Sequence, residues 1–168
     1  MKTIILPGFS VSNKEWADKT AKGFAKQKIE SKVHNWRHWV GEQISPRDQI
    51  EDIVEQIGGD KINILAKSVG TYVLSLLIPR IKNQIGKIVL CGIPINDLSE
   101  DDLEKYRGLS DINSENIICF QNSTDSHGSY DQIKDFLKNI SSEIEVISKP
   151  GGSHDYPYTQ DFIEFLQD

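Results

Sequence analysis

Residues 61–74 read KINILAKSVGTYVL, and this stretch decides the fold. Ile62, Ile64 and Leu65 form a short apolar run, which is typical of a buried strand. A second apolar run follows Ser68 and continues to Leu77 without a polar face wide enough for an exposed helix. The two runs are joined by the pattern small–x–Ser–x–small, here Ala66-Lys67-Ser68-Val69-Gly70. The stretch therefore predicts a buried strand, a sharp turn that carries a serine, and a buried helix.

The serine pattern is that of a nucleophile elbow. The hydroxyl of Ser68 must project clear of the sheet, and the residues two before and two after it must be small because the two backbones crowd there. Ala66 and Gly70 meet that demand. The turn also places the backbone N–H of Val69 at a helix N-terminus, where negative charge is stabilised. The plain alternative is a surface serine after a strand.

Strand-like and helix-like segments alternate along the rest of the chain. Besides the strand before Ser68, the sequence predicts strands at 3–6, 29–36, 87–91, 116–121 and 144–147. It predicts helices at 13–27, 46–57, 69–82, 130–139 and 159–167. This alternation indicates an α/β protein, a three-layer α/β/α sandwich around a mainly parallel six-stranded sheet. We expect residues 1–168 to form a single domain.

Capping residues mark several of these helix starts. Ser12 and Glu15 have the spacing of a capping box before residues 13–27. Ser45 precedes Pro46, which is typical of a helix start. Ser99 is expected to cap a short helix within the polar, acidic segment 94–114, which is a candidate for a small lid or insertion.

Composition limits the class of partner and compartment. The chain has 19 Lys and Arg against 25 Asp and Glu, a net charge of −6, which argues against a nucleic-acid partner. No apolar run approaches the length of a membrane span, so we expect no membrane partner. The N-terminal residues enter a strand directly, without a signal-peptide pattern, so we expect a cytoplasmic protein. Cys91 and Cys119 each lie in or at the end of an apolar run and are expected to be buried free thiols.

The loops after the predicted strands supply further reactive groups. Functional residues of an open parallel sheet gather at the carboxyl ends of its strands. Ser68, Asp125 and His154 follow three of these strands in the chain order serine, acid, histidine. A serine hydroxyl is a weak nucleophile until a histidine takes its proton, and the histidine needs a carboxylate to hold its tautomer. After the first strand, Gly8 allows a tight turn that lets the N–H of Phe9 face an oxyanion.

Taken together, these motifs resemble the small, lidless α/β hydrolases of the retinoblastoma-binding-protein-9 and YdeN-like serine hydrolase family. The resemblance spans nearly the whole chain. It rests on Leu6-Pro7-Gly8, Ala66-Lys67-Ser68-Val69-Gly70, Asp125 and Gly152-Ser153-His154. It implies a Ser-Asp-His triad, oxyanion donors at Val69 and near Phe9, and hydrolysis of carboxylic esters or related acyl groups without a metal or other cofactor.

Two residues depart from the family pattern at the elbow. Ala66 replaces the more usual glycine, which is sterically acceptable. Lys67 replaces the commoner histidine before the nucleophile. We expect Lys67 to point off the turn and to add positive charge near the mouth of the site.

The acid of the triad has alternatives. Asp125 is favoured because polar neighbours surround it and because it lies four residues after the strand end near Gln121. Asp97, after the fourth strand, is an alternative acid position. Asp131 lies where a helix begins, and Asp155 adjoins His154 but is expected to point away from its ring. His127 is expected to be exposed.

Aromatic residues lie at the carboxyl end of the second predicted strand. Trp36 and Trp39, with His38 between them, either wall an acyl pocket or pack at the sheet edge. With Gly8, the two tryptophans are therefore candidate substrate-binding residues.

Two functions from different classes follow. The first is a carboxylesterase-like serine hydrolase that acts on a small acyl substrate through an acyl-enzyme, with short esters preferred over long ones. The second is a hydrolase fold that serves as a protein-binding module, because fold does not dictate function. Its candidate surfaces are residues 94–114 and 36–39.

Overall fold

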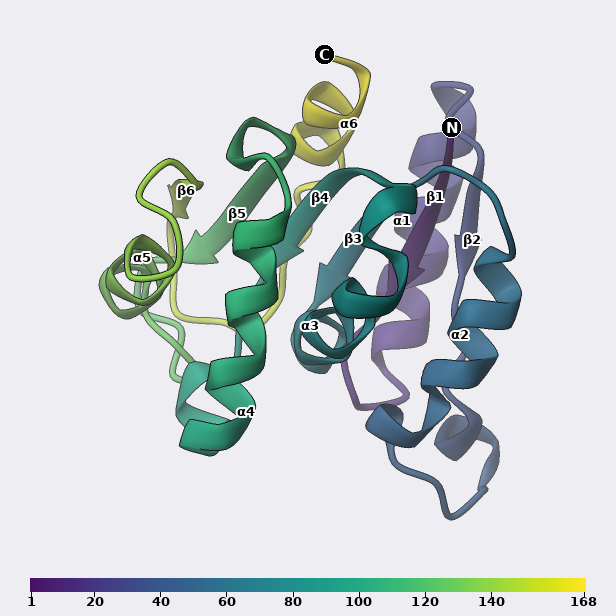
Figure 1. Ribbon diagram of the computed structural model, residues 1–168, viewed down its shortest axis with the longest axis horizontal. Coiled ribbons are helices and arrows are strands. Elements are labelled where there is room, and N and C mark those ends of the chain that lie inside the picture. The colour runs from purple at the N-terminus through teal and green to yellow at the C-terminus, as the bar shows by residue number, and fades with distance from the viewer.

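Six strands form the middle layer of the computed structural model, which describes residues 1–168 (Figure 1). They are β1 Lys2–Leu6, β2 Ser31–Val33, β3 Ile62–Lys67, β4 Ile85–Cys91, β5 Ile117–Asn122 and β6 Glu145–Lys149. Every neighbouring pair is parallel, in the order β2-β1-β3-β4-β5-β6. The strand order reverses between β1 and β3, so the loops after these two strands open on either side of a crevice. The predicted parallel six-stranded sheet is confirmed.

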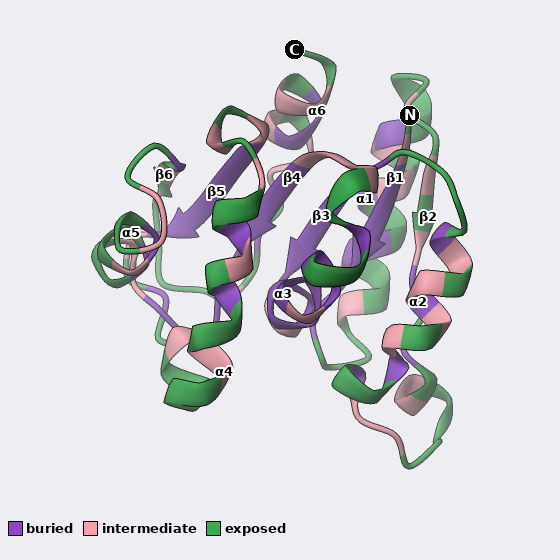
Figure 2. Ribbon diagram, in the orientation of Figure 1, coloured by how far each residue is buried: buried purple, intermediate pink, exposed green.

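Helices cover both faces of the sheet. One face carries α1 Asn13–Lys26 and α6 Thr159–Gln167, and the other carries α2 Ile50–Ile57, α3 Val69–Ile81, α4 Glu100–Glu104 and α5 Tyr130–Lys138 (Figure 1). Successive strand residues point to opposite faces, so Ile64 lies in the core under α3 and Leu65 in the core under α1. All residues of β3 and β5 are buried (Figure 2). The α/β/α sandwich follows from these two apolar layers.

The turn after β3 brings α3 against the end of β1. A Cβ added to Gly70 would lie 2.1 Å from the Leu6 carbonyl oxygen and 2.9 Å from that of Pro7. Both atoms belong to backbone in the buried layer, so neither moves easily. This contact is the reason why the elbow pattern requires a small residue at position 70.

Two of the predicted elements differ from the structure in length. The strand expected at 29–36 is β2 Ser31–Val33 only, because it is an edge strand paired on one side, with β1. Beyond it, the His34 N–H still donates to the Ile5 carbonyl at 2.9 Å, and then the chain turns away. The helix expected from residue 46 begins as a 3-10 turn at Pro46–Gln49 and becomes α-helical at Ile50.

The capping box at Ser12 is wrong. Ser12 already has helical dihedral angles (φ −59°, ψ −25°), whereas an N-cap residue is extended, so its hydroxyl makes no cap hydrogen bond. It bonds the Ser10 hydroxyl at 2.7 Å instead, and Glu15 pairs with Lys19 at 2.7 Å. Ser99 does cap α4, since its Oγ accepts the Asp102 N–H at 3.2 Å.

Segment 94–114 is packed on the body of the domain. Its 3-10 turn Lys105–Asp111 buries Tyr106 and Leu109. The Tyr106 and Thr71 hydroxyls lie 2.7 Å apart, which joins the segment to α3. Its expected role as a lid stays a prediction.

Two further observations concern the chain as a whole. Cys91 and Cys119 are buried and unbridged, as predicted. No helix of the structure combines the length and the apolar character needed to cross a membrane.

We predict that Gly70→Ala lowers the free energy of unfolding by about 3 kcal/mol, because the added methyl group must displace backbone atoms. Urea denaturation measures the loss. Gly59→Ala is the matched control, since a Cβ there would meet nothing within 4 Å. The control should be neutral or slightly stabilising. Equal losses in the two variants would contradict the contact described above.

Candidate active site

Ser68 occupies the turn between β3 and α3 in a strained conformation. Its φ is 54° and its ψ is −125°, a region that residues with a side chain rarely adopt and that costs about 1–3 kcal/mol. The Ser68 N–H donates to the Cys91 carbonyl at 3.0 Å, and the Ser68 carbonyl accepts the Thr71 N–H at 2.8 Å. These bonds to β4 and α3 hold the strained residue in place.

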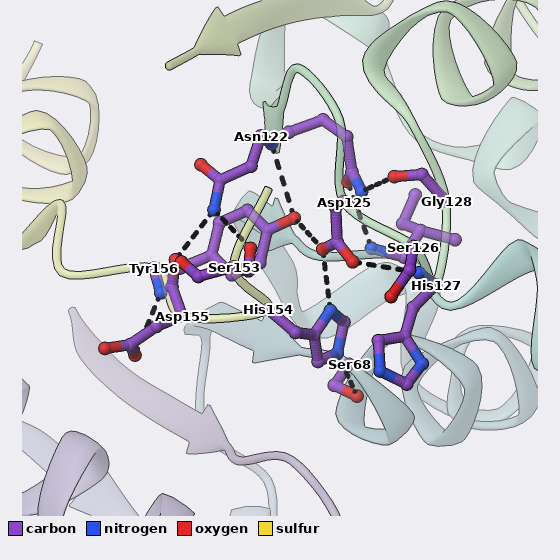
Figure 3. A network of polar contacts seen from close by, with 12 residues as sticks. Ser68, Asn122, Asp125, Ser126, His127, Gly128, Ser153, His154, Asp155 and Tyr156 are labelled. Atoms are coloured by element: carbon purple, nitrogen blue, oxygen red, sulfur yellow. Dashed lines mark hydrogen bonds and ion pairs between the residues drawn. The ribbon is translucent and has the colours of Figure 1, made fainter. Parts of the chain in front are cut away.

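The loops after β5 and β6 bring two further groups to Ser68. The His154 Nε2 lies 2.8 Å from the Ser68 Oγ, and its Nδ1 lies 2.7 Å from the Asp125 Oδ2 (Figure 3). Asp125 is 2% exposed and His154 is half-buried. The structure thus brings together the serine, acid and histidine named from the sequence, in one hydrogen-bonded line.

Asp125 receives more hydrogen bonds than the histidine alone provides. Its Oδ2 accepts the Tyr156 hydroxyl at 2.6 Å, and its Oδ1 accepts the His127 backbone N–H at 2.9 Å. Burial acts to raise the pKa of Asp125, but the bonds from His154, Tyr156 and His127 outweigh it, so the pKa is lowered. The carboxylate is therefore held ionised beside the histidine ring.

Tyr156 and Asn122 are two site residues that sequence reasoning missed. Burial and the neighbouring Asp125 raise the pKa of Tyr156, which keeps its hydroxyl a donor. The side chain of Asn122 donates at 2.8 Å to the carbonyls of Ser153 and Asp155, on both sides of the histidine (Figure 3). Asn122 ends β5, so the loop that carries the histidine is tied to the sheet. An asparagine at the end of a strand is the only sequence signal of this contact.

The other acid candidates lie elsewhere. Asp97 pairs with His127 Nδ1 at 2.5 Å. Asp155 accepts its neighbour's N–H at 3.1 Å, and Asp131 lies in the exposed first turn of α5. Of the four candidates, Asp125 alone bonds the His154 ring.

The His127 side chain is 42% exposed, and its ring lies beside the ring of His154. Its ring centroid lies 4.1 Å from that of His154, at an interplanar angle of 43°. A second His–Asp pair, formed by His127 and Asp97, therefore lies directly beside the first.

The loop after β1 is held through its carbonyl groups. The indole N–H of Trp36 donates to the carbonyls of Pro7 at 3.1 Å and Gly8 at 3.2 Å. The Phe9 carbonyl accepts bonds from His38 at 2.7 Å and Trp39 at 2.8 Å. With the carbonyls engaged by this aromatic cluster, the Phe9 N–H has no acceptor within the chain. The loop therefore offers an unused donor near the elbow.

The candidate substrate-binding residues are placed differently from one another. Trp36 is 1% exposed and lies beneath the loop, so it supports the loop and presents no face to a substrate. Trp39 is half-buried and also bonds the loop. Gly8 is buried, and a Cβ there would lie 2.6 Å from the Asn13 Oδ1. Trp36 therefore packs in the interior and does not form the wall of an acyl pocket.

A polar cleft opens beside His154, between the loop after β1, the start of α1 and the loop before α6. Its volume is about 630 Å³, and one of its 12 lining residues is hydrophobic. The lining includes Ser10, Asn13, Lys19, Lys67 and Asp155. No group of three or more histidine, cysteine, aspartate or glutamate side chains is placed to hold a metal ion.

Comparison with known proteins identifies the fold. No family model and no curated protein matches the chain by sequence. Among solved structures, a lidless α/β serine hydrolase from Xanthomonas campestris superposes with a TM-score of 0.73 at 15% identity, covering 99% of this chain and 78% of that one. This chain has the α/β-hydrolase fold.

Two further structures agree with this fold. An α/β serine hydrolase homologue from Coxiella burnetii has a TM-score of 0.71 at 17% identity and covers 99% of this chain and 83% of its own. The ydeN gene product of B. subtilis has a TM-score of 0.70 at 14% identity and covers 99% of both chains. The predicted likeness to lidless, YdeN-like α/β hydrolases is thus confirmed for the fold, which is what identities this low can show.

We predict that Tyr156→Phe lowers the free energy of unfolding at pH 7 by about 1.5–3 kcal/mol, because it removes a hydrogen bond to a buried carboxylate. The folded-state pKa of Asp125 is lowered. The bond's contribution is therefore complete above the usual aspartate pKa of about 3.9 and is lost as the pH falls through the lowered value. Urea denaturation at pH 7 and at pH 3 measures the change.

Tyr158→Phe is the matched control for this prediction. The Tyr158 hydroxyl donates at 2.6 Å to the neutral amide oxygen of Asn122, so its loss should not depend on the charge of Asp125. The destabilisation by Tyr156→Phe should shrink at pH 3 relative to that by Tyr158→Phe. The same pH dependence in both variants would contradict the assigned role of the Tyr156 hydroxyl.

Proposed function

We propose that this chain is a serine hydrolase that cleaves small carboxylic esters or related acyl groups through an acyl-enzyme. One observation carries the proposal: the unbroken line from Ser68 Oγ through His154 to Asp125 on a strained turn. Strain of this kind persists only where the surroundings impose it, and it clusters at functional sites. The α/β-hydrolase fold supports the same class of chemistry.

In the proposed first step, the Ser68 Oγ attacks the acyl carbonyl carbon while the His154 Nε2 takes the hydroxyl proton. The carbonyl π-electrons move to the oxygen, and the N–H groups of Val69 and Phe9 stabilise this oxyanion. Asp125 accepts the Nδ1–H of His154 and stabilises the imidazolium. When the tetrahedral intermediate collapses, His154 gives the proton to the leaving alcohol, and Ser68 is left acylated.

In the proposed second step, water attacks the acyl carbon and loses a proton to the His154 Nε2. The second tetrahedral intermediate collapses with release of the carboxylic acid, and the proton returns to the Ser68 Oγ. The bonds from Tyr156 and His127 to Asp125 keep that carboxylate ionised and immobile throughout. Over both steps the leaving alcohol gains the serine proton, and a proton from the attacking water restores the serine.

A protein-binding module is the other function expected from the sequence, and it stays an expectation. A module without catalysis would gain nothing from a strained serine at Ser68 or from a buried carboxylate aligned with His154. The half-exposed cluster around Trp39 and the segment 94–114 are its candidate surfaces. No contact in the structure favours it over the hydrolase.

We predict that a fluorophosphonate probe labels the wild-type protein and leaves Ser68→Ala unlabelled, because the probe reacts with an activated serine. Ser126→Ala is the matched control, since Ser126 is an exposed serine next to Asp125. Labelling of Ser126→Ala should equal that of wild type. Equal labelling of wild type and Ser68→Ala, or labelling of neither, would overturn the proposed function.

We predict that Asp125→Asn lowers kcat by about 10⁴-fold, as loss of the acid does in other serine triads, because the histidine tautomer is no longer held. Asp97→Asn should cost less than about tenfold, since Asp97 contacts His127 and not His154. Ester hydrolysis measures both, and circular dichroism checks the fold. The opposite ranking would mean that the acid is wrongly assigned while leaving the serine mechanism intact.

A further inference from the structure

Lys67 is a buried cation directly before the proposed nucleophile. It is the last residue of β3 and is 4% exposed. Its Nζ donates to the Asn13 Oδ1 at 2.5 Å and lies 5.3 Å from the centroid of the Trp16 ring. An ammonium group has three donors, and one of them is used here.

No carboxylate pairs with Lys67. The half-buried Lys149, by contrast, pairs with Asp161 at 2.5 Å. Burial lowers the pKa of Lys67, and the nearby Asp155 and Asp125 carboxylates offset this only in part. Buried charges in proteins are normally paired, because an unpaired one is expensive to desolvate. Lys67 is therefore a buried amine without a carboxylate partner.

The acceptor that Lys67 does have is a neutral and rigidly held amide. The Asn13 Nδ2 donates to the Ser10 carbonyl at 3.1 Å and to the Ser10 Oγ at 2.9 Å, which directs the Oδ1 toward the lysine. The same Oδ1 packs against Gly8. The cation is thus fixed relative to the loop that carries the Phe9 N–H.

Lys67 and His154 both line the cleft described above. The other charges of the cleft are already engaged or exposed. Glu15 and Lys19 pair with one another at 2.7 Å, and both side chains are exposed. Asp155 accepts a backbone N–H at 3.1 Å and forms no ion pair with the lysine. Lys67 is the buried, unpaired charge of the cleft.

We propose that Lys67 recognises a carboxylate on the substrate, so that the substrate class is a short ester or amide that also carries a carboxylate group. This inference rests on the proposed function and narrows its substrate. The carboxylate occupies the cleft beside His154 and supplies the partner that the buried ammonium lacks. A charged hydrogen bond of this kind contributes about 1.5–3 kcal/mol, or about 10- to 160-fold in kcat/KM.

Substrates matched in length test the inference on the wild-type protein. Ethyl butyrate is neutral, monoethyl succinate carries a carboxylate on its acyl side, and ethyl 4-aminobutyrate carries an ammonium group in the corresponding place. The butyryl ester of glycolate carries its carboxylate on the leaving-group side. We expect one of the two carboxylate esters to exceed ethyl butyrate by at least about tenfold in kcat/KM, and which one it is identifies the side that Lys67 reads.

Variants connect the preference to the lysine. Lys67→Met should lower the ratio of kcat/KM for the carboxylate ester to kcat/KM for ethyl butyrate to about one. Lys67→Arg should retain part of the preference, because it keeps the charge. Lys19→Met is the matched control, since Lys19 lines the same cleft but is exposed and paired, and it should leave the ratio unchanged. The ratio is the readout because a purely structural lysine would change rates for all esters alike.

The inference is overturned if wild type hydrolyses ethyl butyrate or ethyl 4-aminobutyrate as fast as both carboxylate esters. This holds whether or not Lys67→Met folds. A ratio that survives Lys67→Met also overturns it. If the fluorophosphonate labels Ser68 and these results are negative, the recognition by Lys67 fails and the hydrolase stands. If there is neither labelling nor hydrolysis of any ester, the hydrolase itself fails.

Discussion

The site depends on one steric constraint, the close approach of α3 to the carboxyl end of β1. A single added carbon at Gly70 would lie 2.1 Å from the Leu6 carbonyl oxygen. Because the helix begins so near the sheet, the chain must turn within one residue, and Ser68 takes a positive φ of 54°. The hydroxyl then stands above the sheet, where the loops after β5 and β6 also end. Packing on both faces of β3 supplies the energy that maintains this strain.

A buried polar network converts this position into a defined geometry. Asp125 accepts three hydrogen bonds, from His154, Tyr156 and the His127 backbone, and these offset its loss of hydration. Asn122 binds the backbone carbonyls on both sides of His154. Such networks are costly when partly satisfied and rigid when fully satisfied. Here each member is satisfied. The end of β5 therefore fixes the position of the loop that carries His154.

Two His–Asp pairs lie side by side at the carboxyl ends of β4, β5 and β6. Neighbouring strands bring their loops together, so Asp97 after β4 reaches His127 after β5, and Asp125 after β5 reaches His154 after β6. The histidine of the second pair is half-exposed, and its ring centroid lies 4.1 Å from that of His154, with the rings tilted by 43°. The ring of His154 alone bonds Ser68. The two His–Asp pairs therefore differ in whether their histidine is aligned with Ser68.

By itself the sequence determined the alternation of strands and helices, the parallel sheet and the turn at Ser68, because periodicity and small residues at a tight turn are local properties. It also favoured Asp125 among several aspartates and pointed to His154, since the carboxyl ends of parallel strands share one edge. Tertiary structure decided the rest. The hydroxyl of Tyr156 reaches Asp125 across 31 positions of sequence, and the burial of Lys67 depends on where α1 packs. Ser12 failed as a cap for the same reason: its dihedral angles are set by the loop after β1, which no local pattern describes.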